Sequence, residues 1–304
     1  MPGATAGERV TRPATGPTGL VVVDKEPGWT SHDVVARVRS LFGQRRVGHA
    51  GTLDPDATGV LLVGLGRVTR LLRFLSGMGK EYTCEVVLGV ATDTLDASGA
   101  VTDEWDMTGV TLEEARAAAA RLTGTIEQVP PMVSAVKVGG RRLHELHRKG
   151  LEVERPSRSV RVDRFDLEPG DGPGVLRAHV ECSSGTYVRT LAADLGLALG
   201  GGAHLRALRR TRVGSFTAEE AQPVGDLGPE SLRSPAEALR DLDRVTVDPT
   251  LAVVVARGRP LDRVPLGATG EGPWAVVDPT GRLLAVYEAT ATDAIRPAVV
   301  LASR

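Results

Sequence analysis

The sequence has 304 residues, enough for one large domain with a smaller one or for two domains of medium size. Hydrophobic residues make up 41% and charged residues 25%, as in an ordinary globular protein, and no apolar run approaches the roughly 18–20 residues that span a bilayer. The formal net charge of −1, taken alone, argues against a nucleic-acid partner.

The first half of the chain mixes expected strands and helices. Residues 1–19 are rich in Pro, Gly, Thr and Ala and lack the apolar core of a secretion signal, so we expect a disordered tail. Thr30 and Asp33 have the spacing of a capping box, which predicts a helix that ends at Gly43. Other patterns predict strands at 20–24 and 82–88, a strand or helix start at 60–63, and a second helix at 111–124.

The second half contains further strands and then a change of composition. Strands are expected at 159–167 and 175–182, and a helix at 190–199. Residues 223–235, rich in Pro, Gly, Asp and Ser, are typical of a linker, and short apolar runs separated by turns follow beyond residue 245. Because no regular βαβ alternation is present, these patterns favour an α+β protein with a mixed or antiparallel sheet and a small β-rich C-terminal domain.

The near-neutral net charge hides a segregated charge distribution. Residues 81–115 hold nine acidic residues and no Lys or Arg, whereas residues 137–164 hold nine basic and four acidic ones. Residues 205–214 add four arginines and no acid. Such segregation can build a positive face that attracts phosphates, but a set of solvated loops explains the charges equally well.

The two cysteines suggest the compartment. Cys84 and Cys182 are too few for a disulfide framework or a metal quartet. Together with the lack of an export signal, they predict free thiols in a reducing cytoplasm.

A glycine-punctuated segment contains the first candidate for catalysis. Residues 48–59 read G-H-A-G-T-L-D-P-D-A-T-G and lead into an apolar element. The glycines permit positive φ or a close approach of another backbone, and Asp54 precedes a proline that favours an extended conformation. On these residues alone, Asp54 is a turn or capping aspartate, as most Asp-Pro pairs are.

The same segment resembles the signature of the TruB family of tRNA pseudouridine synthases, which reads G-H-x-G-x-L-D-P-x-A-T-G. Six further motifs resemble those of the family, follow in its order and extend the resemblance over about residues 20–215. They are D-K-E-P-G-W-T-S at 24–31, K-E-Y at 80–82, L-G-V-A-T-D-T-L-D at 88–96, Q-V-P-P-M-V-S-A-V-K at 128–137, S-S-G-T-Y-V-R at 183–189 and G-A-H-L-R-A-L-R-R at 202–210.

The resemblance implies a fold and a domain organisation. The expected fold is the α+β pseudouridine-synthase fold, with a central mixed, mostly antiparallel sheet flanked by helices and loops. The catalytic domain is expected at 20–244, with an RNA-clamping insertion at about 128–158. A small PUA-like, β-rich domain is expected at 245–304.

The resemblance also implies an activity and a catalytic group. A uridine of the tRNA T stem-loop, uridine 55, is isomerised to pseudouridine, with Asp54 as the catalytic carboxylate. The N-glycosidic bond breaks and the base is rejoined to the ribose through carbon. No redox change occurs, so no cofactor and no metal are expected. A carboxylate can act here as nucleophile on the sugar, nucleophile on the base or as a proton acceptor, and the sequence leaves all three open.

Five residues are implied at the substrate. Arg189 resembles the arginine that pairs with the catalytic aspartate, and Tyr82 resembles the aromatic residue that stacks on the target base. Tyr187 and Leu208 are expected to line the same pocket. His49 resembles the residue that enters the RNA where the target nucleotide has flipped out.

The partner implied is tRNA, bound by a monomer through phosphates and shape. The residues expected to contact the RNA backbone are Lys137, Arg141, Arg142, Arg148, Lys149, Arg209 and Arg210.

Some features depart from the family pattern, and other functions remain open. Glu26 is inserted in the first motif, Val133 stands where many relatives carry an aromatic residue, and most of the acidic residues at 81–115 are expected to face away from the RNA. One alternative is an RNA-binding module or RNA chaperone without catalysis. The other is a glycosidase-like hydrolase, which typically needs a second carboxylate. Asp56 is the nearest one in sequence.

Overall fold

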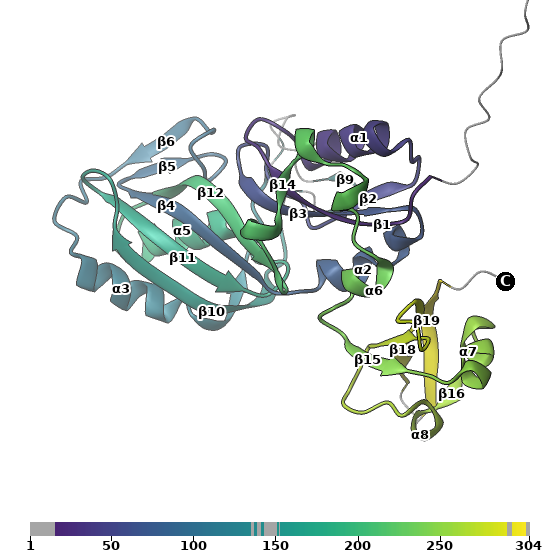
Figure 1. Cartoon of the computed structure of the whole chain (residues 1–304). Helices are drawn as coiled ribbons and strands as arrows, with labels where there is room; N and C mark the ends of the chain where they lie inside the picture. The colour runs from purple at the N-terminus through teal and green to yellow at the C-terminus, as the bar shows by residue number, and fades with distance from the viewer. Residues whose placement is uncertain are drawn as a thin grey trace, which may run out of the picture.

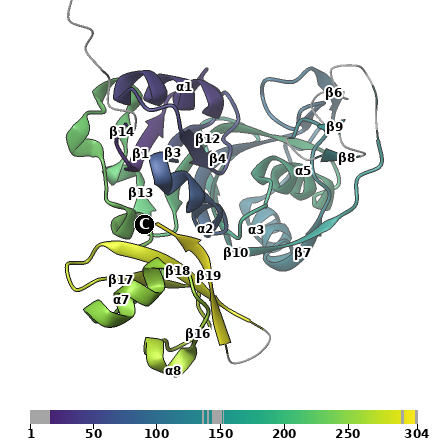
Figure 2. The same cartoon turned by 90° about the vertical axis from the view of Figure 1, so that its right-hand side faces the viewer.

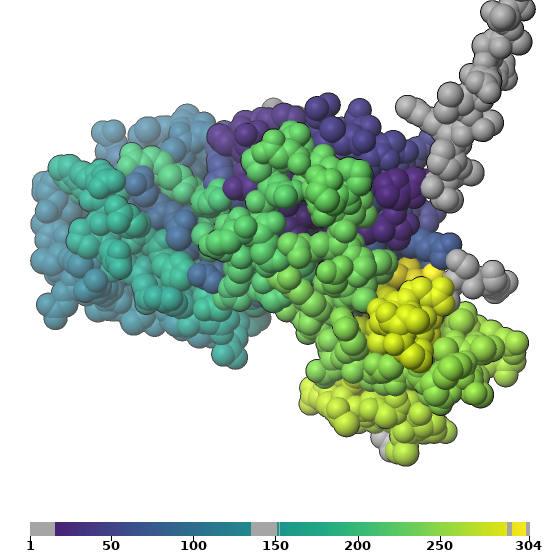
Figure 3. Space-filling view, in the orientation of Figure 1, coloured from purple at the N-terminus to yellow at the C-terminus, as the bar shows by residue number. Residues whose placement is uncertain are grey.

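The computed structural model describes residues 16–134, 137–138, 141–142, 151, 153–290 and 294–301. Within these residues the chain forms a large body around one long sheet and a smaller lobe around a second sheet (Figure 1). The C-terminal lobe lies beside one end of the large body, as the space-filling view shows (Figure 3).

The large sheet contains ten strands in the described part of the chain. Its neighbours pair antiparallel except β1 with β14 and β3 with β12, so the sheet is mixed and mostly antiparallel, as predicted. In spatial order the strands are β14 (Gln222–Pro223), β1 (Gly19–Lys25), β3 (Thr58–Leu65), β12 (Ala203–Val213), β4 (Lys80–Leu88), β11 (Val175–Cys182), β10 (Arg158–Pro169) and β7 (Gly124–Gln128), with β2 (Val47–Ala50) on β3 and β13 (Phe216–Thr217) on β12. Two hairpins outside it are β5 (Val90–Thr92) with β6 (Val101–Glu104), and β8 (Lys137–Val138) with β9 (Arg141–Arg142).

The two halves of this sheet meet where β12 lies between β3 and β4. β12 follows β4 along most of its length but pairs with β3 only at Arg209–Thr58 and Arg210–Gly59. A β-bulge interrupts β12 before this point, and Ala207 within it has a φ of 52°. A bulge re-aims the side chains next to it, and here it turns the strand at the boundary between the halves.

The helices form where local sequence signals favour them. In α1 (Ser31–Phe42), Thr30 and Asp33 form the predicted capping box and Gly43 ends the helix with a φ of 57°. α3 (Leu112–Arg121) begins with a capping box as well and contacts β10, and α5 (Val188–Ala198) contacts β12. The remaining helical segments are η1 (Gly66–Arg70), α2 (Leu72–Ser76), η2 (Ala218–Glu220), η3 (Val224–Asp226), η4 (Pro229–Ser231) and α6 (Pro235–Ala238).

The C-terminal lobe is built on its own sheet. The sheet has five strands in the described residues and begins at Asp243, two residues before the boundary expected from the sequence. In spatial order the strands are β15 (Asp243–Thr246), β17 (Trp274–Val277), β18 (Leu283–Ala289), β19 (Ala294–Val300) and β16 (Leu261–Asp262), with the helices α7 (Pro249–Ala256) and α8 (Arg263–Leu266).

The two bodies share buried side chains. One apolar cluster joins Leu20 and Val22 of β1 to Leu283 and Val286 of β18 and includes Leu301. Arginines of the η1–α2 segment add polar contacts, because Arg67 donates to the carbonyl of Leu301 and Arg70 to that of Val300. Figure 2 shows the C-terminal sheet below this segment. The lobe is therefore packed against the large body rather than tethered to it.

Three segments differ from their sequence-based predictions. Residues 48–50, which begin the glycine-punctuated segment interpreted as a loop, belong to β2 because they pair along the edge of β3. Residues 223–235 are not a linker, since Arg233 exchanges two backbone hydrogen bonds with Leu20. The helix expected at 190–199 begins at Val188, so Arg189 lies in its first turn.

Candidate active site

Asp54 lies on the short segment that connects the edge strand β2 to the central strand β3. Its carbonyl accepts a hydrogen bond from the amide of Ala57, and the hydroxyl of Ser31 bonds both the amide and the carbonyl of Leu53. The ammonium group of Lys25 donates to the carbonyl of Pro55 at 2.7 Å. The backbone on each side of Asp54 is thus held by buried polar groups, which fixes the direction of its carboxylate.

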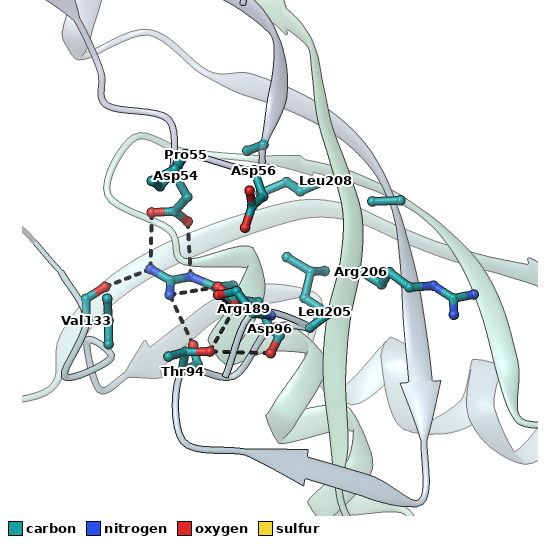
Figure 4. Close-up of a pocket in the computed structure, with 14 residues that line it drawn as sticks. Asp54, Pro55, Asp56, Thr94, Asp96, Val133, Arg189, Leu205, Arg206 and Leu208 are labelled. Atoms are coloured by element: carbon teal, nitrogen blue, oxygen red, sulfur yellow. Dashed lines mark hydrogen bonds and ion pairs between the residues drawn. The ribbon is translucent and has the colours of Figure 1, made fainter. Parts of the chain in front are cut away.

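The carboxylate of Asp54 faces a buried arginine in the first turn of α5. Arg189 approaches one carboxylate oxygen with Nε at 3.1 Å and the other with Nη2 at 3.3 Å (Figure 4). Its Nη1 donates to Asp96 and to the carbonyl of Thr94, and Nη2 also donates to the carbonyl of Val133. The planar guanidinium therefore has a single allowed orientation and binds two carboxylates.

The two carboxylates on Arg189 have pKa values shifted in opposite directions. Burial raises the pKa of Asp54, Arg189 opposes this, and the charge of Asp96 adds to it. Burial also acts on Asp96, but hydrogen bonds from Ser98 and Thr94, together with Arg189, bring its pKa below the usual range. Asp54 is therefore the more basic of the two, and 39% of its side-chain surface remains open to the adjoining space.

Asp54 separates two cavities. The larger, about 400 Å³, extends toward the loop that carries Asp96 and toward the β12 bulge at Ala207 (Figure 4). The smaller, about 100 Å³, is lined by Tyr82 of β4 and by Tyr187. Asp54, Arg189 and Leu208 line both. The structure thus brings together four of the predicted substrate residues, Tyr82, Tyr187, Arg189 and Leu208, around Asp54.

The smaller cavity combines the ion pair with two tyrosine rings, three aliphatic side chains and two threonines. It is lined by Thr52, Leu53, Asp54, Tyr82, Thr186, Tyr187, Val188, Arg189 and Leu208. Tyr82 is buried, and burial raises the pKa of its hydroxyl, so the side chain stays a neutral phenol. Such a space suits a flat uncharged ring with one face toward Tyr82.

The fifth predicted substrate residue, His49, is half-buried on β2. Its ring lies edge-on to that of His32 on α1, with centroids 5.6 Å apart. Burial lowers the pKa of His49, and the nearby His32 and Arg210 lower it further. The side chain is therefore neutral near pH 7 and can enter a base stack without bringing a charge.

The arginines of β12 correct one expectation about RNA contacts. Arg210 is fully buried, 0% exposed, and its guanidinium cannot reach a phosphate from this position. Arg209 is partly exposed but binds both carboxylate oxygens of Asp24, at 3.0 and 2.8 Å. These arginines do not form a free surface run, because β12 lies between β3 and β4 within the sheet.

Acidic residues of the neighbouring strands explain much of the charge segregation. Arg206 pairs with Glu85 and Arg212 with Glu81, both on the adjacent strand β4, and Arg212 also pairs with Glu181 on β11, one strand further. Opposite charges on adjacent strands stabilise the pairing of those strands. Part of the acidic run at 81–115 thus neutralises β12.

The other expected RNA contacts lie mostly beyond the described side chains. Lys137, Arg141 and Arg142 belong to the β8–β9 hairpin, of which the backbone alone is described. Arg148 and Lys149 lie outside the described residues. Among the described residues, no cluster of three or more His, Cys, Asp or Glu side chains could hold a metal ion. None of the described helices has the length and hydropathy to span a bilayer.

Sequence reasoning missed two residues that support the site. Ser31 holds the segment around Asp54, and Asp96 holds Arg189. The signal for Asp96 was present, since it ends the T-D-T-L-D run at 92–96.

Family models and curated proteins resemble the chain over most of its length. Residues 39–188 match the TruB family pseudouridylate synthase N-terminal domain, and residues 189–246 match the tRNA pseudouridylate synthase B C-terminal domain. The chain is 48% identical to tRNA pseudouridine synthase B of Rhodococcus jostii (strain RHA1), covering 93% of this chain and 95% of that protein. It is 45% identical to tRNA pseudouridine synthase B of Mycobacterium tuberculosis (strain CDC 1551 / Oshkosh), covering 90% and 92%.

Solved structures share the fold. A chain of a Cbf5–Nop10–Gar1 complex superposes with a TM-score of 0.70 at 28% identity, covering 90% of this chain and 79% of that one. A chain of an H/ACA RNP bound to a substrate RNA containing 2′-deoxyuridine gives a TM-score of 0.68 at 24% identity, covering 92% and 83%.

Proposed function

The chain belongs to the TruB family and is a tRNA pseudouridine synthase; we propose that it acts on uridine 55 in the T stem-loop, with Asp54 as the catalytic carboxylate. The observation that supports this best is the two-point contact between Arg189 and Asp54 at the boundary of two cavities.

The isomerisation balances without a co-reactant. The bond between C1′ of the ribose and N1 of uracil breaks, and C1′ bonds to C5 instead. The proton on C5 is lost and N1 takes up a proton. A carboxylate can assist as nucleophile or as base, and either role needs its ionised form. Arg189 holds Asp54 in that form while the surrounding burial makes it more basic.

The smaller cavity supports a site for the base. We propose that uracil stacks on Tyr82, with Tyr187 and Leu208 as the remaining walls. A base inside an RNA arm has to leave its stack to reach Asp54. His49 is proposed to fill the space that the nucleotide leaves, because it is neutral and lies on the edge strand next to the catalytic segment.

The proposal for RNA binding rests on charge. We propose that the β8–β9 hairpin within residues 128–158 clamps the T stem-loop through Lys137, Arg141, Arg142, Arg148 and Lys149, with Arg209 contributing from β12. The lobe at 245–304 is proposed to be a PUA-like extension of the RNA-binding surface. We further propose that the protein is a monomer and acts on tRNA in the cytoplasm. Light scattering on the purified protein tests the oligomeric state.

One experiment tests the activity and the catalytic group together. Unmodified tRNA transcript is incubated with the native enzyme, with Asp54→Asn and with Asp56→Asn, and pseudouridine is mapped chemically. The native enzyme and Asp56→Asn are expected to modify uridine 55, and Asp54→Asn to leave it unchanged while still binding tRNA.

Other outcomes identify the alternatives. Release of free uracil that depends on both Asp54 and Asp56 would indicate a hydrolase with two carboxylates. Tight binding by every variant with no chemistry in any would indicate an RNA-binding module. Pseudouridine at another uridine would keep the reaction but refute the target.

A further inference from the structure

Arg210 is a buried cation without a carboxylate partner among the described residues. Its side chain is 0% exposed, and its guanidinium donates to three backbone carbonyls instead. An isolated buried charge is strongly unfavourable unless hydrogen bonds satisfy its donors. The acceptors that Arg210 uses therefore indicate what it stabilises.

Those acceptors lie at the two ends of the segment that carries Asp54. Nη2 donates to the carbonyl of Gly51 at 3.1 Å and Nη1 to that of Thr52 at 3.4 Å, directly after β2. Nε donates to the carbonyl of Val60 at 2.7 Å, in β3. One rigid, planar group thus fixes both the exit from β2 and the entry into β3.

The strand pairing at this point explains why a side chain performs this task. The parallel ladder between β12 and β3 contains the pairs Arg209–Thr58 and Arg210–Gly59 and ends there. The backbones are so close that a Cβ on Gly59 would lie 2.1 Å from the carbonyl oxygen of Arg210. One residue further along β3, the carbonyl of Val60 accepts a hydrogen bond from the side chain of Arg210 instead of from the backbone of β12.

Arg210 also connects this segment to the wall of the smaller cavity. Its backbone pairs with that of Tyr82, the proposed platform for the base, in the β12–β4 ladder, and its charge lowers the pKa of Asp54. Asp54 and Tyr82 come from different halves of the sheet, and Arg210 contacts the structure around both.

We propose that Arg210 is a positioning residue, which clamps the ends of the catalytic segment and fixes the carboxylate of Asp54 relative to Tyr82. The proposal rests on the function proposed above. The planar fork is essential to it, because a lysine ammonium is a single point charge and cannot hold Gly51, Thr52 and Val60 at once.

The test compares Arg210→Lys and Arg210→Gln with Arg212→Lys and Arg212→Gln. Arg212 lies on the same strand and pairs with Glu81 and Glu181 away from Asp54, which makes it the matched control. Each variant is measured at a temperature where circular dichroism shows it fully folded. The readouts are the single-turnover rate constant on unmodified tRNA, the dissociation constant for tRNA, and the pH dependence of the rate.

Both Arg210 variants are expected to lose about 100-fold in rate constant, the size expected when a reacting group is misplaced by about 1 Å, with tRNA affinity unchanged within about twofold. Arg210→Gln removes a positive charge near Asp54 and so moves the acid limb of the rate profile to higher pH. Arg210→Lys keeps the charge and leaves that limb in place. Both Arg212 variants are expected to keep the native rate.

Three results would overturn the assignment. They are a native rate in folded Arg210→Gln, a loss of rate matched by an equal loss of tRNA affinity, and failure of both Arg210 variants to fold, which would assign Arg210 to folding alone. The native enzyme and Asp54→Asn are assayed in parallel. If the native enzyme forms no pseudouridine, the proposed function fails; if it does and one of the three results above is found, only the role of Arg210 fails.

Discussion

Arg189 contacts both carboxylate oxygens of Asp54, with Nε at 3.1 Å and Nη2 at 3.3 Å, across 135 residues of sequence. The arginine is buried and the aspartate lines two cavities, so the ion pair is fixed on one side and open to a substrate on the other.

Arg189→Lys is expected to reduce the single-turnover rate constant by at least about 100-fold. Lysine keeps the charge but loses the planar fork that holds Asp54, Asp96 and the carbonyl of Val133 in one geometry. Filter binding should show tRNA affinity within a few-fold of native. A rate within tenfold of native would show that the charge alone is sufficient.

Asp96→Asn is expected to move the acid limb of the rate profile to lower pH. Asp54 has to be ionised to act, so the rate rises as pH passes through its pKa, which burial raises above 3.8. The negative charge of Asp96 adds to that rise, and its removal therefore lowers the pKa of Asp54. The maximal rate should also fall, because Arg189 loses one anchor. Asp93→Asn, in the same loop, is the control; an acid limb shifted upward in Asp96→Asn contradicts the prediction.

Tyr82→Leu is expected to lose about 1–3 kcal/mol of stabilisation of the flipped base, a rate decrease of about 5- to 150-fold, because an aliphatic side chain offers no π-face. Tyr82→Phe keeps the ring and should retain most of the rate. Single-turnover assays on both variants test this. Equal losses in the two would point to the hydroxyl of Tyr82 rather than to stacking.

Arg209→Gln is expected to reduce the salt dependence of tRNA binding by about one unit in the slope of log K against log salt, if Arg209 contacts one phosphate. Asp24→Asn releases Arg209 from its carboxylate partner and should strengthen binding at low salt. Titrations at several salt concentrations measure both effects. An unchanged slope in Arg209→Gln would confine this arginine to its ion pair.

Leu283→Ala is expected to destabilise the whole protein by about 2–5 kcal/mol, the usual cost of truncating a buried leucine. Leu283 lies in the cluster that includes Leu20 and Val22 of the large sheet, so the two sheets should unfold together. Calorimetry should show a single transition that moves to lower temperature. A separate early transition in the variant would show that the C-terminal lobe unfolds independently.

The sequence by itself determined the local elements and the family. The capping box at Thr30 and Asp33 predicted α1, and the alternation at 82–88 predicted β4, because both signals depend on neighbours within a few residues. The ordered motifs indicated the pseudouridine-synthase fold and the reaction class, which the family comparisons confirm.

The tertiary structure decided which charged residues are buried and which groups meet. Four arginines within residues 205–214 looked like a surface run, yet they occupy a central strand, because acids on β1, β4 and β11 neutralise three of them and backbone carbonyls satisfy Arg210. Burial of a charge depends on partners that only folding brings close. For the same reason the sequence named Asp54 but could not reveal that Arg210 holds both ends of its segment.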